Sequence, residues 1–83
     1  MGRDVVPFSS TAKNIGVGSI YEHYKGPRYK VLGVAHHSET LEEVVIYHPE
    51  NKASDVWVRP LNMFLENITI DGVSRPRFRR VDI

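Results

Sequence analysis

Short runs of β-branched and aromatic residues, each closed by a glycine or proline turn signal, limit the fold of this chain more than any other feature. From position 18 onward, no window repeats apolar residues at the three-and-four spacing of a long helix. This pattern indicates an all-β domain built from short strands. The expected strands are Ile20 to Lys25, Tyr29 to His36, Leu41 to His48, Asp55 to Arg59 and Ile68 to Ile70.

The length of the chain and its lack of cysteine limit the number of domains and exclude several kinds of site. A chain of 83 residues has room for one hydrophobic core, and without cysteine it forms no disulfide, thiolate zinc site or cysteine nucleophile. No segment reaches the roughly 20 consecutive apolar residues that cross a bilayer. We therefore expect a cytoplasmic protein with no membrane partner.

Two features of the strand pattern suggest that the sheet closes into a barrel. Gly33 lies in a strand that is apolar on both faces, where a bend is expected. Pro60 ends the fourth strand and is expected to open one 3₁₀ turn over residues 61–64, before the last strand. Met63 and Phe64 in that turn are then expected to fill one end of the barrel.

The two ends of the chain are expected to differ from the centre. Residues 1–17 show no apolar periodicity and are predicted to be a flexible N-terminal extension. Residues 18–83 are predicted to form a single barrel domain with a basic C-terminal tail. Within it, Asp71 and Gly72 are typical of a type I′ hairpin turn, and Pro76 restricts the last segment to the edge of a sheet.

Several short motifs in one order resemble a known family between Gly18 and Phe78. The resemblance is to the small bacterial domain-of-unknown-function family 1653. The motifs that carry it are His23-Tyr24-Lys25-Gly26, Tyr29 with Val31-Leu32-Gly33, His37-Ser38-Glu39-Thr40 with Glu42, Trp57-Val58-Arg59-Pro60, Met63-Phe64 and Pro76-Arg77-Phe78.

The resemblance implies a fold and no activity. It implies an all-β, five-stranded SH3-like barrel with a short 3₁₀ turn before the last strand, found alone or attached to other domains. It brings no catalytic residue and no cofactor to this chain. The sequence departs from the family pattern at His36, where a basic residue such as arginine is expected, and in a longer loop from Pro49 to Ser54.

Aromatic and basic residues favour a non-catalytic binding module that contacts a protein segment. Strand alternation places Trp57 and Arg59 on one face, where rings and a guanidinium can hold a peptide. The alternative is structural: the rings fill the core, and residues 37–40 form a turn held by side-chain hydrogen bonds. The candidate ligand-binding residues are Tyr24, His37, Ser38, Glu39, Trp57 and Arg59.

Single-stranded nucleic-acid binding is the second hypothesis. Rings can stack on bases while arginines neutralise phosphates. The net charge of only +1 counts against it, and the basic tail is also explained as solvated charge on a terminal strand. The candidate nucleic-acid-binding residues are Arg75, Arg77, Arg79 and Arg80.

Histidines raise a third hypothesis, a small enzyme or a metal site. The spacings of His23, His36, His37 and His48 match no zinc motif. A catalytic triad could combine Ser38 with a histidine, His36 or His37, and an acid, Glu39 or Glu42. Sequence neighbours on one turn rarely have the required geometry. We therefore predict no enzyme, no metal and no cofactor.

Overall fold

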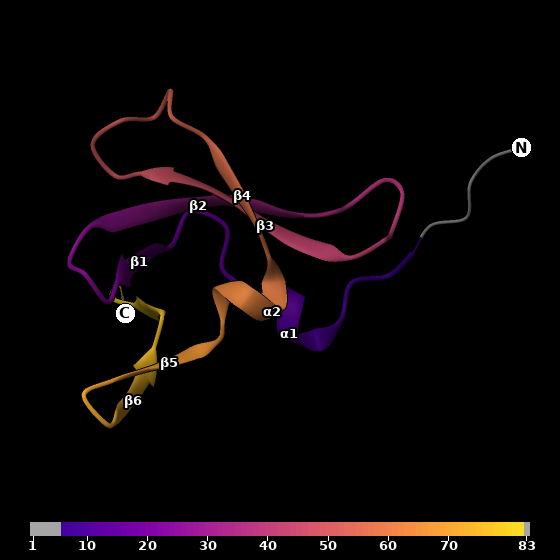
Figure 1. Cartoon of the computed structure of the whole chain (residues 1–83). Coiled ribbons are helices and arrows are strands. Elements are labelled where there is room, and N and C mark those ends of the chain that lie inside the picture. Colours follow the sequence, from indigo (N-terminus) through magenta and orange to yellow (C-terminus); the bar gives the residue numbers. More distant parts are fainter. Residues whose placement is uncertain (1–5, 83) are drawn as a thin grey trace, which may run out of the picture.

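The computed structural model describes residues 6–82 and is dominated by β-strands in two antiparallel sheets (Figure 1). The prediction of an all-β fold is confirmed. No helix in this part of the chain is long and apolar enough to cross a membrane. The elements are α1 (Ser10–Lys13), β1 (Ile20–His23), β2 (Arg28–His36), β3 (Glu43–Pro49), β4 (Trp57–Pro60), α2 (Leu61–Phe64), β5 (Asn67–Ile70), β6 (Val73–Pro76) and β7 (Phe78–Arg80).

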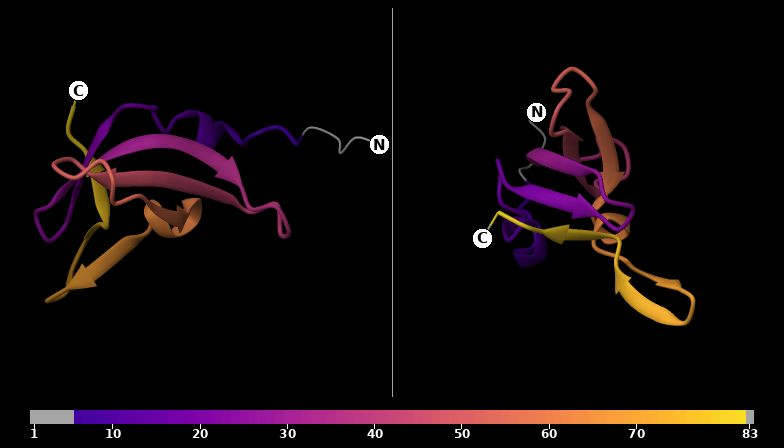
Figure 2. Two further views of the ribbon diagram at one scale, coloured as in Figure 1. Left: turned by 90° about the horizontal axis from the view of Figure 1, so that it is seen from above. Right: turned by 90° about the vertical axis from the view of Figure 1, so that its left-hand side faces the viewer.

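The larger sheet has the order β4-β3-β2-β1-β7, so β4 and β7 are its edges and the sheet is not closed. It curves as an arch over α2 (Figure 2). The register between β2 and β3 shifts between Val31 and Gly33, which places a bulge at Leu32. A bulge bends its strand and increases its twist, and the predicted bend at Gly33 falls there.

The hydrophobic core lies on the inner face of this sheet, the concave side that covers α2. Tyr47 and Val31 are cross-strand partners on that face, and both are buried. The ring of Phe64 from α2 stacks on Phe78 with centroids 4.2 Å apart and planes at 6°, and it meets Tyr21 edge-on. Because β7 carries Phe78 next to β1, the last strand completes the core.

The turn after Pro60 differs in two ways from the prediction. It is one turn of α-helix, in which the amide of Leu65 donates to the carbonyl of Leu61 at 3.0 Å. Phe64 is buried as expected, but Met63 is exposed, and Leu61 is the second buried residue of the turn. With helical spacing, residues three apart share a face, so Leu61 and Phe64 point into the core together.

The expectation of a flexible N-terminal extension does not describe residues 8–15, although residues 1–5 lie outside the described part. Ala12 and Ile15 belong to the hydrophobic core. The Ser9 side chain caps α1 by accepting a hydrogen bond from the Ala12 amide, and the Ser9 amide and hydroxyl donate to the Glu43 carboxylate at 2.7 and 2.8 Å. This segment therefore closes one end of the inner face.

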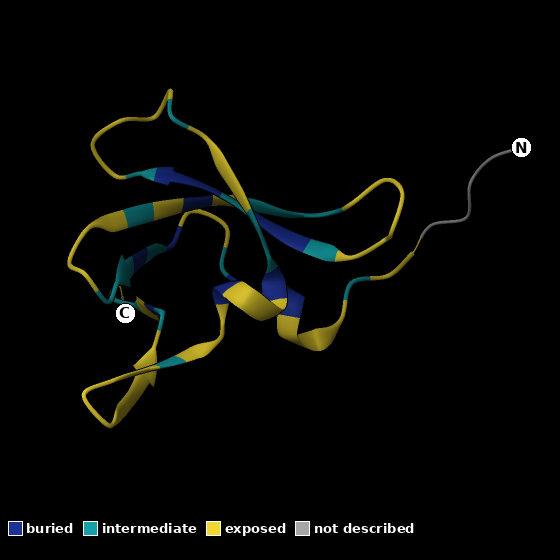
Figure 3. Cartoon of the chain, in the orientation of Figure 1, coloured by how far each residue is buried: buried dark blue, intermediate teal, exposed yellow. Residues whose placement is uncertain are grey.

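Strands β5 and β6 form a hairpin that projects away from the larger sheet, and most of its residues are exposed (Figures 1 and 3). Asp71 and Gly72 have φ angles of 52° and 77°, as the predicted type I′ turn requires. We expected Ile68 to Ile70 to supply the last strand of the main sheet. That place is taken by β7, since β5 pairs only with β6.

Candidate functional site

A hollow of about 180 Å³ opens on the inner face beside the edge strand β4, and we call it the Trp57 groove. It is lined by Tyr29, Tyr47, Trp57 and Arg59. Tyr47 lies directly opposite Trp57 in the β3–β4 register, and Val45 lies opposite Arg59. Cross-strand partners share a face, so Trp57 and Arg59 are on the core side of the sheet. Strand alternation predicted that these two residues share a face but not which face it is.

Trp57 is unusual because it is on the core side and yet 54% exposed. Its neighbours Val56 and Val58 are 53% and 62% exposed, so three large apolar side chains in a row meet solvent. Val56 directly precedes β4, and Trp57 and Val58 belong to this strand, which has no neighbour on its outer side in the described sheet. An edge strand leaves alternate backbone N–H and C=O groups unpaired, which another extended segment can use.

Arg59 is held in place by aromatic residues. Its Nε donates to the Tyr47 hydroxyl at 3.1 Å, and its guanidinium carbon is 5.7 Å from the centroid of the Phe78 ring. Within residues 6–82 it forms no ion pair, and its terminal nitrogens make no hydrogen bond. The guanidinium is thus fixed in position but retains free donors beside the groove.

Positive charge gathers next to the groove around His23. Burial lowers the pKa of His23 below its usual value, and the positive charges of Arg59, Arg77 and Lys25 lower it further. His23 is therefore neutral near pH 7. The Tyr24 ring lies 4.4 Å from the His23 ring, and the Lys25 ammonium is 5.8 Å from the centroid of the Tyr24 ring.

Arg77 contributes a buried donor to this region. Its terminal Nη2 pairs with Glu66 at 2.9 Å, but its Nε is buried and has no hydrogen-bond partner in the described part of the chain. A buried guanidinium N–H without a partner is unfavourable by about 1–3 kcal/mol. This region therefore carries more hydrogen-bond donors than the chain itself satisfies.

The six residues predicted to bind a ligand do not lie together. Tyr24 and Trp57 lie toward the end of the sheet where β2 begins, and Arg59 lies nearer its middle, opposite Val45. The turn from His37 to Glu39 joins β2 and β3 at the opposite end (Figure 1). The nine-residue strand β2 separates these ends by on the order of 25 Å. A compact ligand at Tyr24 and Trp57 therefore does not reach the turn from His37 to Glu39, and Arg59 lies between the two.

The geometry of that turn supports its structural explanation. His37 Nδ1 accepts hydrogen bonds from the amides of Glu39 and Thr40, at 3.1 and 3.3 Å, and the Thr40 hydroxyl accepts from the amide of Glu42. Leu41 has a φ of 63°, which reverses the chain. The side chains of His37 and Thr40 thus stabilise the turn, in agreement with the structural alternative.

The arginines of the nucleic-acid hypothesis are largely paired with carboxylates. Arg79 pairs with Glu22 at 2.9 Å and Arg80 with Asp82 at 2.8 Å, in addition to the Arg77–Glu66 pair. Arg75 lies on the projecting hairpin, opposite Ile68. The basic tail is therefore divided between two sheets and does not form one continuous arm.

The histidines do not converge. His36 stacks on Phe8 with centroids 4.2 Å apart, and His48 is buried with its Nδ1 2.6 Å from the Pro49 carbonyl. Between residues 6 and 82, no three histidine, aspartate or glutamate side chains are grouped closely enough to hold a metal ion. No observation therefore favours the metal hypothesis.

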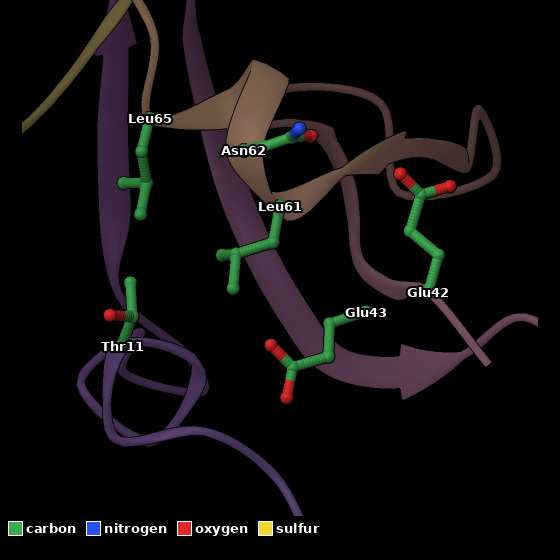
Figure 4. Close-up of a pocket in the computed structure, with 6 residues that line it drawn as sticks. All are labelled: Thr11, Glu42, Glu43, Leu61, Asn62 and Leu65. Atoms are coloured by element: carbon green, nitrogen blue, oxygen red, sulfur yellow. The ribbon is translucent and has the colours of Figure 1, made fainter.

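A second hollow, of about 240 Å³, lies between α1, α2 and the start of β3 (Figure 4). It is lined by Thr11, Glu42, Glu43, Leu61, Asn62 and Leu65. Figure 4 shows the Glu43 carboxylate between the two helical turns, where it accepts the two hydrogen bonds from Ser9. Since that carboxylate is already engaged within the chain, we assign this hollow to the junction of the N-terminal segment with the sheet.

Sequence reasoning missed Tyr29 and Tyr47 as groove residues. Tyr29 meets Tyr47 edge-on with centroids 5.4 Å apart, which forms the floor of the groove. Alternation within β4 was enough to pair Trp57 with Arg59. The tyrosines could be added only from the register between strands, which a single sequence does not reveal.

Comparison with known proteins gives a family and a fold. A family model described as "Protein of unknown function (DUF1653)" matches residues 19–80. A crystal structure of a DUF1653 protein from Bordetella bronchiseptica is similar, with a TM-score of 0.71 and 32% identity over 84% of this chain and 91% of that one. No curated protein matches this chain. Neither similarity names an activity.

Proposed function

The chain belongs to the DUF1653 family, as the motifs from His23 to Phe78 predicted, and from that premise we propose that it is a non-catalytic module that binds an extended protein segment. The segment lies along β4, with the Trp57 groove receiving its side chains. Tyr24, Trp57 and Arg59 are retained from the predicted site. The turn from His37 to Glu39 is left outside the groove.

The observation that carries this proposal is the coincidence of a free strand edge with an exposed tryptophan. Natural edge strands are usually protected by charge, proline or bulges, because an apolar edge pairs with other chains. Here β4 carries Arg59 and Pro60 in its second half, whereas Trp57 and Val58 leave its first half apolar and exposed. Adding a strand to an edge gives affinity through the backbone, while pockets for alternate side chains give specificity.

We also propose that the domain is an open form of the SH3-like barrel. The support is the strand order, in which β4, β3, β2 and β1 are consecutive neighbours and the last strand returns to pair with β1. A single helical turn before β5 agrees with the predicted turn near the end of the fold. The projecting β5–β6 hairpin is then an insertion between that turn and the closing strand.

Peptide selection on the full chain tests the binding proposal. A random peptide display library is panned on the immobilised protein, and the selected peptides are measured by isothermal titration calorimetry. We expect micromolar binding that Trp57→Ala weakens at least tenfold. The control variant Val17→Ala changes another exposed apolar residue, 72% exposed and outside the groove, and should leave binding unchanged.

Single-stranded RNA provides the competing outcome. Amide NMR spectra are recorded while a mixed short RNA is added at low and at physiological salt, because phosphate contacts weaken steeply with salt. Shifts around Trp57 at both salt concentrations, with no peptide enriched by the selection, would replace the peptide proposal with nucleic-acid binding. Peptide enrichment that does not depend on Trp57 would also overturn it.

A further inference from the structure

We infer that the segment bound along β4 carries an acidic side chain two residues away from an apolar one, with the carboxylate at Arg59 and the apolar group at Trp57. This inference rests on the proposed function, since it specifies which segment the groove accepts. The group that binds Arg59 is a side-chain carboxylate of the peptide.

Arg59 supplies the charged half of this specificity. The ring contacts and the Tyr47 hydrogen bond fix its guanidinium, so little side-chain freedom is lost when it binds a ligand. Within residues 6–82 it has no carboxylate partner, whereas Arg77, Arg79 and Arg80 each have one. A fixed guanidinium with free terminal donors suits a carboxylate, which it can bind through two parallel hydrogen bonds.

The surrounding charges exclude a cationic ligand. The positive charges of Lys25 and Arg77, like that of Arg59, lower the pKa of His23, so all three lie near this imidazole. An aromatic groove alone could hold a methylated lysine through cation–π contacts. Because Arg77 is paired with Glu66, the excess positive charge comes from Arg59 and Lys25, and it repels such a ligand and attracts an acidic one.

The spacing of two follows from strand geometry. Trp57 and Arg59 are two residues apart on β4 and both line the groove. Side chains of a strand added beside β4 alternate with the same period, and each lies about 5 Å from its neighbour on the same face. An acid beside Arg59 therefore leaves one residue pointing away before the apolar residue beside Trp57.

Three blocked pentapeptides in a threonine background test this spacing by NMR titration of the full chain. The first has Phe second and Glu fourth, the second replaces that Glu by Gln, and the third moves the Glu to the position next to Phe. A fourth peptide, with Glu second and Phe fourth, covers the opposite strand direction. We expect the spaced acidic peptide to bind at least about tenfold more tightly than the other two, since a charged hydrogen bond contributes roughly 1.5–3 kcal/mol.

Two protein variants and one internal probe complete the experiment. Arg59→Gln should remove the preference for Glu over Gln, while Arg75→Gln, on the separate hairpin, should leave it intact. Binding of the acidic peptide should also raise the pKa of His23, followed through its ring proton shifts, because a nearby carboxylate stabilises the charged imidazole.

The outcomes separate this inference from the proposed function. Equal binding of all three peptides, lost with Trp57→Ala, would overturn the acidic preference and keep the binding module. A preference for Glu that survives Arg59→Gln would also overturn the assignment to Arg59. No shift at β4 with any peptide, together with no peptide enriched by display, would overturn the proposed function itself.

Discussion

The two halves of the inner sheet face contain similar aromatic residues but differ in what covers them. In one half, which we call the filled half, Phe64 and Leu61 of α2 and Ile15 from the N-terminal segment complete the packing, and all three are buried. In the other half, at the Trp57 groove, Tyr47 is buried but the Trp57 ring is 54% exposed, and no element within residues 6–82 covers it. The difference teaches that an aromatic residue on a core-facing position is structural only where a second element covers it.

The largest expected effect is the loss of stability when a buried ring is removed from the filled half. Phe64 is fully buried and contacts the rings of Tyr21, Tyr47 and Phe78. Phe64→Ala should lower the free energy of unfolding by about 3–5 kcal/mol, because it removes a large buried ring and leaves a cavity. Urea denaturation followed by tryptophan fluorescence measures the loss.

The matched variant in the groove is Trp57→Ala. Trp57 is larger than Phe64, but more than half of it is exposed, so the variant should lose no more than about 1 kcal/mol. Circular dichroism replaces fluorescence as the probe for this variant. A loss as large as that of Phe64→Ala would show that both halves are core, and the comparison would fail.

The N-terminal cover of the filled half gives a second test, of smaller effect. Ile15 is 5% exposed and packs in the core. Ile15→Ala should lower the free energy of unfolding by about 2–4 kcal/mol, within the range for a buried isoleucine. Val17→Ala, two residues later and largely exposed, should change it by no more than about 0.5 kcal/mol. Equal, small effects would mean that the segment does not cover the sheet in solution.

Local patterns in the sequence predicted much of the filled half. Alternation and β-branched residues located β1 to β4 to within a few residues, and Asp71 with Gly72 identified the hairpin turn. Phe64 was predicted to fill the core. These predictions succeeded because each depends on neighbours within about four residues along the chain.

Features that depend on distant pairing were not predictable in this way. The return of β7 to β1 joins residues more than fifty positions apart, and the four-residue helix α1 is too short to show a helical period. For the site, Trp57 and Arg59 could be paired by alternation within one strand. The length of the β2–β3 pair, which separates them from His37, follows only from the register of the folded sheet.

The smallest expected effect comes from the hydrogen bonds between Ser9 and the charged Glu43 carboxylate, which hold the N-terminal segment against the sheet. The Ser9 amide and then the Ser9 hydroxyl lower the pKa of Glu43 below its ordinary value of 4.5, because both stabilise the charged carboxylate. A depressed folded-state pKa adds stability that is fully present above pH 4.5 and is lost as the pH falls through the folded-state value. We therefore expect Glu43→Gln to destabilise the protein at neutral pH and to differ little from the wild type at low pH.

Urea denaturation of the wild type and of Glu43→Gln, from neutral to acidic pH, measures the difference in their free energies of unfolding. The contributions of the other carboxylates are the same in both proteins and cancel in this difference. Glu42→Gln is the control, since the Glu42 carboxylate makes no hydrogen bond in the described part of the chain and its loss should matter little at any pH. The Ser9 amide proton should also move with the ionisation of Glu43 at a pH below 4.5. A Ser9 amide that ignores this ionisation would mean that residues 8–15 leave the sheet in solution, and the filled half would then be as open as the Trp57 groove.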